Sequence, residues 1–492
     1  MAFLIGGANT ESAAYQIDNS VRFNNDDSPF IHKASLGSSS SNAKKWTVSF
    51  WAKLGPGLTA HRCVFSAGEA SGGEYVQINF TDEDKLQIYS SNQFGQADNT
   101  ATAIRTNALY RDVSAWYHVV YAIDFTDGTA GDRIKLYVNG SRVTSFELTN
   151  NIPAQNTDND RIGANNIDHF IGKFTDSSSE YFDGYLAEFH FIDGDAKAST
   201  DFGETNDNGV WVPKKYAGSY GNNGFFLDFR EPNIGNANEE AIGNIGADYS
   251  GNANHFASSG ITTLDQTTDT PTNNFATLNP LNSSASVALS EGNTKHTNSG
   301  ANDQASAATM GFAKGKWYWE VKIVDKAEVG INLNSDILQL SNDSSVGSND
   351  ANFKLTGLIT NSAGGSNDFR HNGGTESITS VSLSDNDIVS IAVDADNGKI
   401  WFAKNGTYFN SGDPAAGSNE AKDFSGAYTS GNFITPVGLV ATGDGDILEY
   451  NFGNPPFAIS SGNADANGYG NFEYAVPSGF YSLCTKNLAE YG

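Results

Sequence analysis

Short runs in which apolar and polar residues alternate recur along the whole chain, and helical periodicity is nearly absent. Three clear runs are WTVSFWAKL (residues 46–54), EYVQINF (74–80) and WYHVVYAIDF (116–125). They are rich in Val, Ile, Tyr, Phe and Trp and are bounded by Gly, Asn, Asp and Ser, which is typical of half-buried antiparallel strands. Because such runs follow one another at intervals of about 10 residues, we predict an all-β protein built from antiparallel, jelly-roll-like β-sandwiches.

Two stretches far apart in the sequence, IKLYVNGSRVTSF (134–146) and GKIWFAKNGTYF (398–409), have the same pattern. In each, an alternating run is interrupted by Asn-Gly and then resumes. Asn139 and Asn405, each followed by glycine, tolerate the positive φ that a two-residue type I′ turn requires. We therefore predict two β-hairpins, one in each of two domains. A further turn at residues 394–398 extends the second hairpin to a three-stranded meander.

The alternating runs divide the chain into two sandwich domains, residues 18–216 and 283–492. Between them, residues 217–282 contain few alternating runs but several large apolar side chains. These are Phe225, Phe226, Leu227, Phe229, Phe256, Phe275 and Leu278. Side chains of this kind favour burial, so we expect an ordered, loop-rich connector. Residues 1–17 lack strand alternation, and we expect them to be a segment that docks the protein onto a partner.

Composition narrows the classes of partner. The chain has 29 Lys and Arg against 57 Asp and Glu, a formal net charge of -28, so nucleic acid is not an expected partner, because phosphate binding needs a basic surface. Cys63 and Cys484 are the only cysteines, which excludes a disulfide framework or a cysteine zinc site. No apolar run is long enough to cross a bilayer, and the N-terminus does not resemble a secretory signal. We expect a soluble protein made in a cytoplasm, without membrane insertion.

The first domain resembles the laminin-G-like, concanavalin A-like jelly rolls in the order of WTVSFWAKLG, WYHVVYAID, IKLYVNGSRV and FDGYLAEFHFIDG. The second domain resembles the SPRY sandwiches in GKWYWEVKI, VGI, DIVSIAVDADNGKIWFAKNG and TPVGLVATGDGDILEYNFGNPPF. Together with the linking phrases GVWVPKKYAGSYGNNGFFLDF and DTPTNNFATLNPLN, the combination looks like the virion or tail-fibre-type proteins of tailed phages.

This resemblance implies a structural protein of the virion, made in the host cytoplasm, with other virion proteins as partners. We expect a fibre or surface appendage that binds a host-surface glycan or protein during adsorption. Phage fibres as a class are commonly homotrimers, so a homo-oligomer is a further expectation. Two alternatives stay open: an architectural protein that decorates the capsid or joins the tail without binding a receptor, and a polysaccharide-degrading enzyme.

The sequence offers no catalytic set, and we expect no enzyme activity. Hydrolases of the concanavalin A-like fold carry paired acidic residues on one strand, and neither common spacing of that pair occurs. The nearest approach, TDEDKLQ at residues 81–87, is better interpreted as a turn that exposes Asp82, Glu83 and Asp84. Serine-hydrolase, zinc-protease and phosphate-loop motifs are also missing from the sequence.

Calcium is the one cofactor candidate. The resemblance to laminin-G-like jelly rolls implies a calcium site at the sandwich edge, and calcium prefers carboxylate and carbonyl oxygens. Asp124, Asp127 and Asp132 supply three carboxylates just before the first hairpin. The alternative is that these residues only form turns, as Asp and Gly commonly do.

Aromatic residues and histidine have mostly structural interpretations. His118 alternates with core positions of a predicted strand, and we expect it to be a satisfied strand residue. Five tryptophans within strand patterns are predicted to be in or near the core: Trp51, Trp116, Trp317, Trp319 and Trp401. Aromatic side chains that stack on sugars would come from loops. The candidates there are Phe94, Tyr216, Tyr220 and Tyr408, and the sequence does not choose among them.

Overall fold

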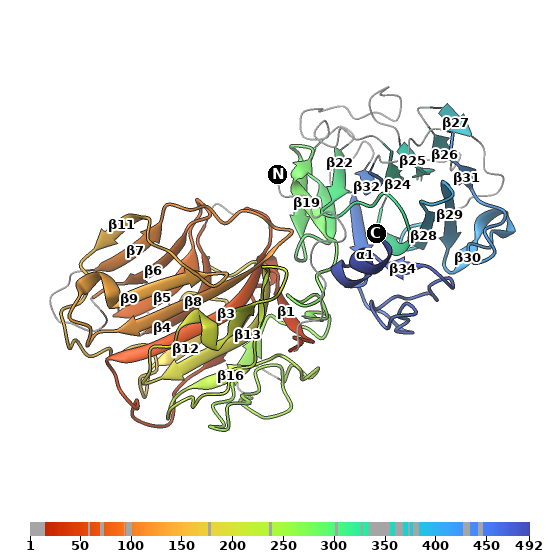
Figure 1. Ribbon diagram of the computed structural model, residues 1–492. Coiled ribbons are helices and arrows are strands. Elements are labelled where there is room, and N and C mark those ends of the chain that lie inside the picture. Colours follow the sequence, from red (N-terminus) through yellow and green to blue (C-terminus); the bar gives the residue numbers. More distant parts are fainter. Residues whose placement is uncertain are drawn as a thin grey trace. The chain divides into compact units, whose positions relative to one another are not determined.

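The computed structural model describes residues 15–57, 60–68, 73–92, 94, 101–175, 179–235, 239–300, 304–325, 328–333, 355–359, 368–371, 374–376, 383–426, 433–440 and 446–492. The described residues form two compact units, residues 15–272 and 273–492, which we name the N-terminal and C-terminal domains. Both are antiparallel β-sandwiches (Figure 1). The prediction of an all-β chain with two sandwich domains is confirmed.

Two eight-stranded sheets form the N-terminal domain. The β3 sheet consists, in spatial order, of β10 (Ser141–Arg142), β9 (Ile134–Val138), β8 (Trp116–Asp124), β3 (Lys45–Leu54), β13 (Gly184–Asp193), β1 (Ser20–Phe23) and β18 (Gln266–Thr267), with β16 (Phe225–Leu227) paired to β13. The β5 sheet consists of β11 (Phe146–Asn150), β7 (Thr102–Thr106), β6 (Leu86–Ser90), β5 (Tyr75–Phe80), β4 (Arg62–Gly68), β12 (Asp168–Ile171), β2 (Phe30–Lys33) and β17 (Ala257–Ser259). A small hairpin joins β14 (Gly203–Thr205) to β15 (Trp211–Pro213). Short 3-10 turns occur at Asn25–Asp27, Ala130–Asp132 and Ser199–Asp201.

The register of the β5 sheet separates a core face from an outer face. One row of paired residues crosses six strands and is buried against the β3 sheet: Ile31, Ile171, Phe65, Ile78, Ile88 and Ile104. The adjacent row points the other way, because successive side chains of a strand alternate between faces. It contains His32, Phe170, Ser66, Gln77, Tyr89 and Ala103. Hydrophobic burial therefore fixes which face carries polar and aromatic groups.

The predicted connector at residues 217–282 is corrected by the structure. Its strands β16, β17 and β18 pair with β13, β2 and β1 of the N-terminal domain, and Phe225 and Phe256 are buried in that domain's core. The division between the two domains therefore falls at residues 272–273. The segment is ordered, as predicted, because its large apolar side chains complete the first sandwich.

The predicted docking segment, residues 1–17, is described only from residue 15. Ile17 packs against Trp51 and Trp116, and the Tyr15 hydroxyl donates a hydrogen bond to Glu188. Residues 15–17 thus belong to the N-terminal domain, and residues 1–14 lie outside the described residues.

The C-terminal domain contains two further sheets. One consists of β19 (Leu278–Ser283), β22 (Gln304–Ala308), β32 (Thr435–Val440), β24 (Glu328–Asn332), β25 (Leu355–Ile359), β26 (Asp368–His371) and β27 (Gly374–Glu376). The other consists of β20 (Val287–Ser290), β21 (Lys295–Asn298), β33 (Ile447–Asn451), β23 (Lys316–Ile323), β28 (Ile388–Asp394), β29 (Lys399–Lys404) and β30 (Thr407–Tyr408), with β31 (Lys422–Asp423) on β29 and β34 (Tyr481–Ser482) on β23. A 3-10 turn at Phe409–Ser411 and one helix, α1 (Thr485–Tyr491), complete the domain. Within the described ranges, no helix is long and apolar enough to span a membrane.

A buried carboxylate fastens the C-terminal segment to this domain. Glu320 on β23 accepts hydrogen bonds from the Tyr318 hydroxyl (2.9 Å), the Asn451 side chain (3.2 Å) and the backbone N–H groups of Glu473 (2.9 Å) and Tyr474 (2.8 Å). Burial raises the pKa of Glu320, while these donors oppose that shift. The buried carboxylate thus has four donors, and the two from Glu473 and Tyr474 hold their irregular segment on the sheet.

Both predicted hairpins are present. Strand β9 turns into β10 at Asn139 and Gly140, with φ of 46° and 78°. Strand β29 turns into β30 at Asn405 and Gly406, with φ of 46° and 79°. Positive φ at both central positions confirms the type I′ geometry. With β28, the second hairpin forms the predicted meander.

The asparagine of each hairpin also clasps the neighbouring strand. The backbone N–H of Asn139 donates to the His118 carbonyl (2.9 Å), and its Oδ1 accepts the His118 N–H (2.8 Å). Asn405 makes the same two bonds to Ile388, both at 2.9 Å. In both domains the repeated sequence therefore forms a hairpin whose asparagine is hydrogen-bonded to the backbone of the neighbouring third strand.

We expect the Asn139→Ala and Asn405→Ala variants each to lose about 2 kcal/mol of unfolding free energy, as alanine resists positive φ and leaves a backbone N–H without its acceptor. The urea-induced unfolding transition of the domain that carries the substitution measures this loss. The control is Asn156→Ala, an exposed asparagine with φ of 68°, which should lose only about half as much through backbone strain. Equal losses in all three variants would contradict the role of the side-chain clasp.

Candidate functional site

The outer face of the β5 sheet is the candidate site, and two paired segments, residues 172–175 and 179–182, lie beside it and form the arms of a hairpin. Lys173 and Tyr181 are paired across this hairpin. The Ser66 hydroxyl of β4 donates to the Lys173 carbonyl at 2.8 Å and accepts the Thr175 N–H at 3.0 Å. These bonds hold one arm of the hairpin on the sheet and place the Lys173 and Tyr181 side chains near β2 and β12.

A lysine surrounded by aromatic rings lies at this end of the face. The Lys173 Nζ atom lies 4.7 Å from the ring centroid of Phe30, 5.3 Å from that of Phe170 and 5.9 Å from that of Tyr181. Phe170 is buried, whereas Phe30, Lys173 and Tyr181 are partly exposed. Contacts of this kind stabilise an ammonium group by about 0.5–2 kcal/mol each, so the charge is held in one place at the surface.

A histidine and an aspartate extend this group of residues. The His32 ring stacks on Phe170 at a centroid distance of 4.4 Å, and its Nε2 lies 3.8 Å from the Asp168 carboxylate, whose side chain is 42% exposed. Burial lowers the pKa of His32, and Asp168 opposes that shift. We name the whole group the Lys173 cluster. Its members are Phe30, His32, Asp168, Phe170, Lys173 and Tyr181.

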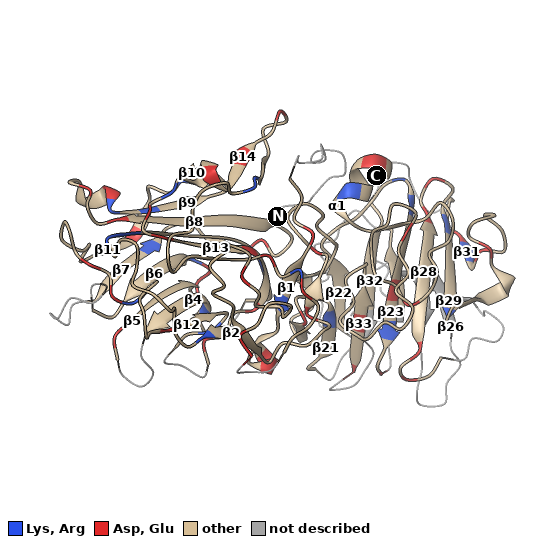
Figure 2. Cartoon of the chain, turned by 90° about the horizontal axis from the view of Figure 1, so that it is seen from below, with Lys and Arg blue, Asp and Glu red and all other residues tan. Residues whose placement is uncertain are grey.

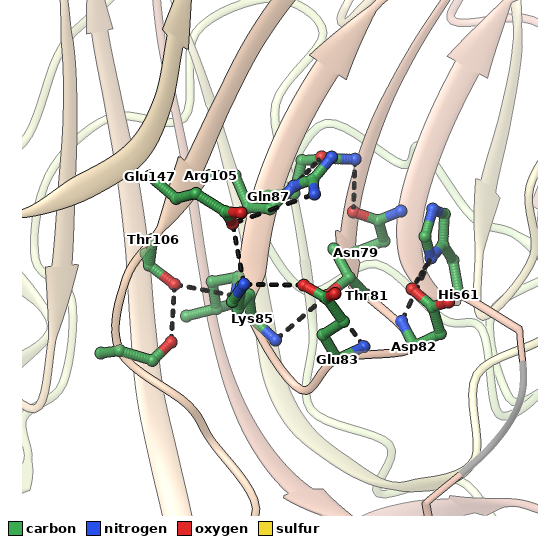
Figure 3. Close-up of polar contacts among 12 residues, drawn as sticks. His61, Asn79, Thr81, Asp82, Glu83, Lys85, Gln87, Arg105, Thr106 and Glu147 are labelled. Carbon is green, nitrogen blue, oxygen red and sulfur yellow. Dashed lines mark hydrogen bonds and ion pairs between the residues drawn. The ribbon is translucent and has the colours of Figure 1, made fainter.

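A polar network occupies the other end of the same face (Figure 3). Gln87 on β6 donates to Asn79 on β5 at 3.4 Å and accepts from Arg105 on β7 at 2.8 Å. Lys85 lies between Glu83 and Glu147, at 2.7 and 2.8 Å. Hydrogen bonds to Glu147 and Glu83 raise the pKa of Lys85. In Figure 2 the ribbon positions of Lys and Arg residues are interspersed with those of Asp and Glu residues.

The acidic turn at residues 81–87 joins β5 to β6, as predicted. Each of its three carboxylates has a basic partner: Asp82 pairs with His61, Glu83 with Lys85 and Asp84 with Arg62. The hydrogen bond from Lys85 lowers the pKa of Glu83. A general acid for glycan hydrolysis needs a raised pKa instead, so the turn is suited to holding strands together.

A serine, a histidine and a tryptophan form a chain of contacts on the β3 sheet. The Trp211 Nε1–H donates to Nδ1 of His118 at 3.0 Å, and His118 Nε2 lies 2.9 Å from the Ser49 hydroxyl. Since Nδ1 accepts, the neutral ring carries its proton on Nε2 and donates to Ser49, the reverse of the arrangement that activates a serine. Burial lowers the pKa of His118 to about 3. The prediction that His118 is a satisfied strand residue agrees with this geometry.

The calcium candidates Asp124, Asp127 and Asp132 each have a basic neighbour. The pairs are Asp124 with Lys45 at 2.9 Å, Asp127 with Lys135 at 3.7 Å, and Asp132 with Arg142. Asp124 and Asp127 also accept backbone N–H groups within their own turns. Among the described side chains, no group of three or more His, Cys, Asp or Glu residues is arranged to hold a metal ion. The structure therefore does not bring the three carboxylates together.

We expect millimolar calcium to leave the melting temperature of the N-terminal domain unchanged, because a cation would have to displace Lys45, Lys135 and Arg142. Differential scanning calorimetry with and without calcium measures this. A specific site filled well above its Kd would raise stability by about 2.7 kcal/mol at a hundredfold excess. A rise of several degrees that the Asp127→Asn variant abolishes would establish calcium binding at this loop.

The aromatic loop candidates are placed differently from expectation. Phe94 is fully buried in the N-terminal core and Tyr216 is 8% exposed, so neither presents a ring to a ligand. Tyr220 is partly buried, with its hydroxyl 2.9 Å from His190 Nδ1. Tyr408 is also partly buried. These loops fold back over sheet surfaces because their rings cover apolar strand residues. The five predicted tryptophans are all buried.

Comparison with known proteins supports the two-domain assignment. Residues 31–200 match the family described as the concanavalin A-like lectin/glucanases superfamily, and residues 316–439 match the SPRY domain family. Among curated proteins, none matches this sequence.

Solved structures show distant likeness. The SPRY domain of human HERC1 is 16% identical, with 35% of this chain and 96% of that chain covered and a TM-score of 0.27. A heptameric SAP-like pentraxin from Limulus polyphemus is 15% identical, with 37% and 80% covered and a TM-score of 0.26. Such values are too low to transfer any property. From the family matches and the strand topology, the chain combines an N-terminal laminin-G-like, concanavalin A-like β-sandwich with a C-terminal SPRY domain.

Proposed function

We propose that this chain is a non-enzymatic structural protein of a tailed-phage virion, in which it acts as a fibre or surface appendage and binds a host-surface glycan or protein during adsorption. The phage context rests on the resemblance of the sequence to virion proteins. The binding role rests on one structural observation, the Lys173 cluster. It presents aromatic, cationic and anionic side chains together on the outer face of a rigid sheet.

The arrangement suits adhesion better than chemistry. The carboxylates of the acidic turn are paired with bases, and His118 is buried in the wrong tautomer to activate Ser49. A surface of partly exposed rings and charges binds one ligand weakly, and many copies on one particle increase the avidity. An appendage needs no stronger individual site.

Competition for adsorption tests this function. Purified chain is added to host cells before the phage, and free phage is counted over time. We expect the chain to bind the cells and to slow adsorption in proportion to its concentration. Binding to neither cells nor a glycan array, with unchanged adsorption, would contradict the proposal. Electron microscopy of virions that places the chain beneath other proteins would favour an architectural role instead.

A further inference from the structure

We propose that the Lys173 cluster is a subsite for an acidic saccharide, a sugar ring that carries a carboxylate. This inference rests on the proposed function, because it names the ligand class and the place of binding for the same surface. It concerns the part of the β5 sheet where β2 and β12 meet the paired segments 172–175 and 179–182.

The first argument is the state of the lysine. Seven other lysines of the N-terminal domain form ion pairs with carboxylates: Lys33, Lys44, Lys45, Lys53, Lys85, Lys135 and Lys197. Lys173 instead contacts three aromatic rings, and it forms no ion pair with the described residues. In a chain of net charge -28, an ammonium group without a carboxylate is available to an external anion.

The second argument is that the ammonium is already ordered. Its three ring contacts and the hydrogen bond to the Lys173 carbonyl hold both ends of the residue. Binding a carboxylate there therefore costs less lysine side-chain entropy than binding one at a free surface lysine. A charge-assisted hydrogen bond at such a position contributes more than a neutral one.

The third argument is the set of side chains that surround the Lys173 ammonium group. Phe30 and Tyr181 are partly exposed rings beside it, and the C–H face of a sugar packs on rings of this kind. Asp168, with a side chain 42% exposed, can accept hydrogen bonds from sugar hydroxyl groups. Cation, ring and acceptor together match a hydroxylated ring with one carboxylate.

Other anions match less well. A nucleic acid needs several Lys or Arg side chains to neutralise its successive phosphates, whereas the cluster contains one lysine and no arginine. Inorganic phosphate has no apolar face to place on Phe30 or Tyr181. A purely apolar ligand would remove water from the charged groups of Lys173 and Asp168 without giving either a polar contact in return. The acidic saccharide is the class that uses the ammonium group of Lys173, the exposed rings of Phe30 and Tyr181 and the carboxylate of Asp168 together.

Isothermal titration of the full chain with uronate tetrasaccharides, galacturonate and mannuronate, tests the inference against neutral galactotetraose. We expect at least one uronate to bind, with an affinity that falls as salt rises, and the neutral sugar to bind about tenfold more weakly. Lys173→Gln should weaken uronate binding about tenfold, and Lys173→Arg should largely retain it. The matched control Lys44→Gln removes an ion-paired lysine of the same domain and should leave binding unchanged.

Equal affinity for acidic and neutral sugars, no uronate binding, or binding unchanged in Lys173→Gln would overturn the inference. Unchanged thermal unfolding shows that each variant is folded. The proposed function is judged separately by the adsorption assay. A chain that competes for adsorption but does not need Lys173 retains that function and loses this subsite, whereas a chain that neither competes nor binds sugar loses both.

Discussion

The Lys53→Met variant should lower the unfolding free energy of the N-terminal domain by about 3–5 kcal/mol. Lys53 Nζ lies 2.8 Å from an Asp269 carboxylate oxygen, and both side chains are 0% exposed. Trp116 donates to the other oxygen of that carboxylate at 3.2 Å. Burial lowers the pKa of Lys53, and Asp269 opposes that shift. Methionine fills a similar volume but removes the charge, so the Asp269 carboxylate is left buried without its counter-ion.

Chemical denaturation of the purified variants measures this loss. The double variant Lys53→Met/Asp269→Leu removes both charges and should recover most of the stability, because the penalty comes from an unpaired buried charge. The surface pair Lys44 and Asp158 supplies the control, since Lys44→Met should change stability by about 1 kcal/mol or less. A Lys53→Met variant as stable as this control, or a double variant no better than the single one, would contradict the expected coupling.

This ion pair also explains why the domain boundary was misplaced from sequence. Asp269 lies in the stretch predicted as a connector, yet it is bonded to Lys53 on β3, more than two hundred residues earlier. The apolar residues of that stretch, such as Phe225 and Phe256, correctly predicted that it is ordered. They could not show which strands it joins, because short strands like β16 and β18 have too few residues for a readable period.

The hairpins were predictable because their signal is local. Asn139 and Asn405 each precede glycine between alternating runs, and two residues suffice to specify a type I′ turn. Their side-chain bonds to the backbone of His118 and Ile388 were not predictable. Those bonds require the neighbouring strand to be in a defined register, which only the folded sheet provides.

The candidate site was missed for a related reason. The predicted sugar-stacking rings were in loops and included Phe94 and Tyr216, which are buried in the folded domain. Phe30 and Phe170 occupy outward-facing positions of their strands. They become neighbours only because β2 pairs with β12, and these two strands are far apart in the sequence. A search for aromatic residues at outward positions of strands would have selected both, although it would not have placed Lys173 between them.

Acidification from about pH 7.5 to about pH 5 should lower the stability of the N-terminal domain by about 4 kcal/mol through two histidines. Burial lowers the pKa of His118 to about 3 and that of His169 to about 4, from 6.5. Geometry agrees, because His118 Nδ1 accepts from Trp211 and His169 Nε2 accepts the Gly163 N–H at 2.9 Å. Protonation in the folded state would break these bonds.

The sign follows from the direction of the shifts. Below pH 6.5 these two histidines become protonated in the unfolded chain but stay neutral in the folded domain. Their contribution to stability is therefore complete above pH 6.5. As the pH falls from there toward the folded pKa values, each histidine removes about 1.4 kcal/mol of unfolding free energy per pH unit. Each histidine accounts for about 2 kcal/mol at about pH 5. The C-terminal domain has His296, whose pKa burial lowers to about 3, and Glu320, whose raised pKa acts in the opposite direction. It should therefore lose less than the N-terminal domain.

Urea unfolding at several pH values, followed in the parent and in His118→Gln and His169→Gln, separates these contributions. Each variant should be less stable at neutral pH but should show a shallower loss on acidification, because it removes one group that protonates only on unfolding. Parallel slopes in parent and both core variants would mean that carboxylates, not buried histidines, set the acid sensitivity of this sandwich.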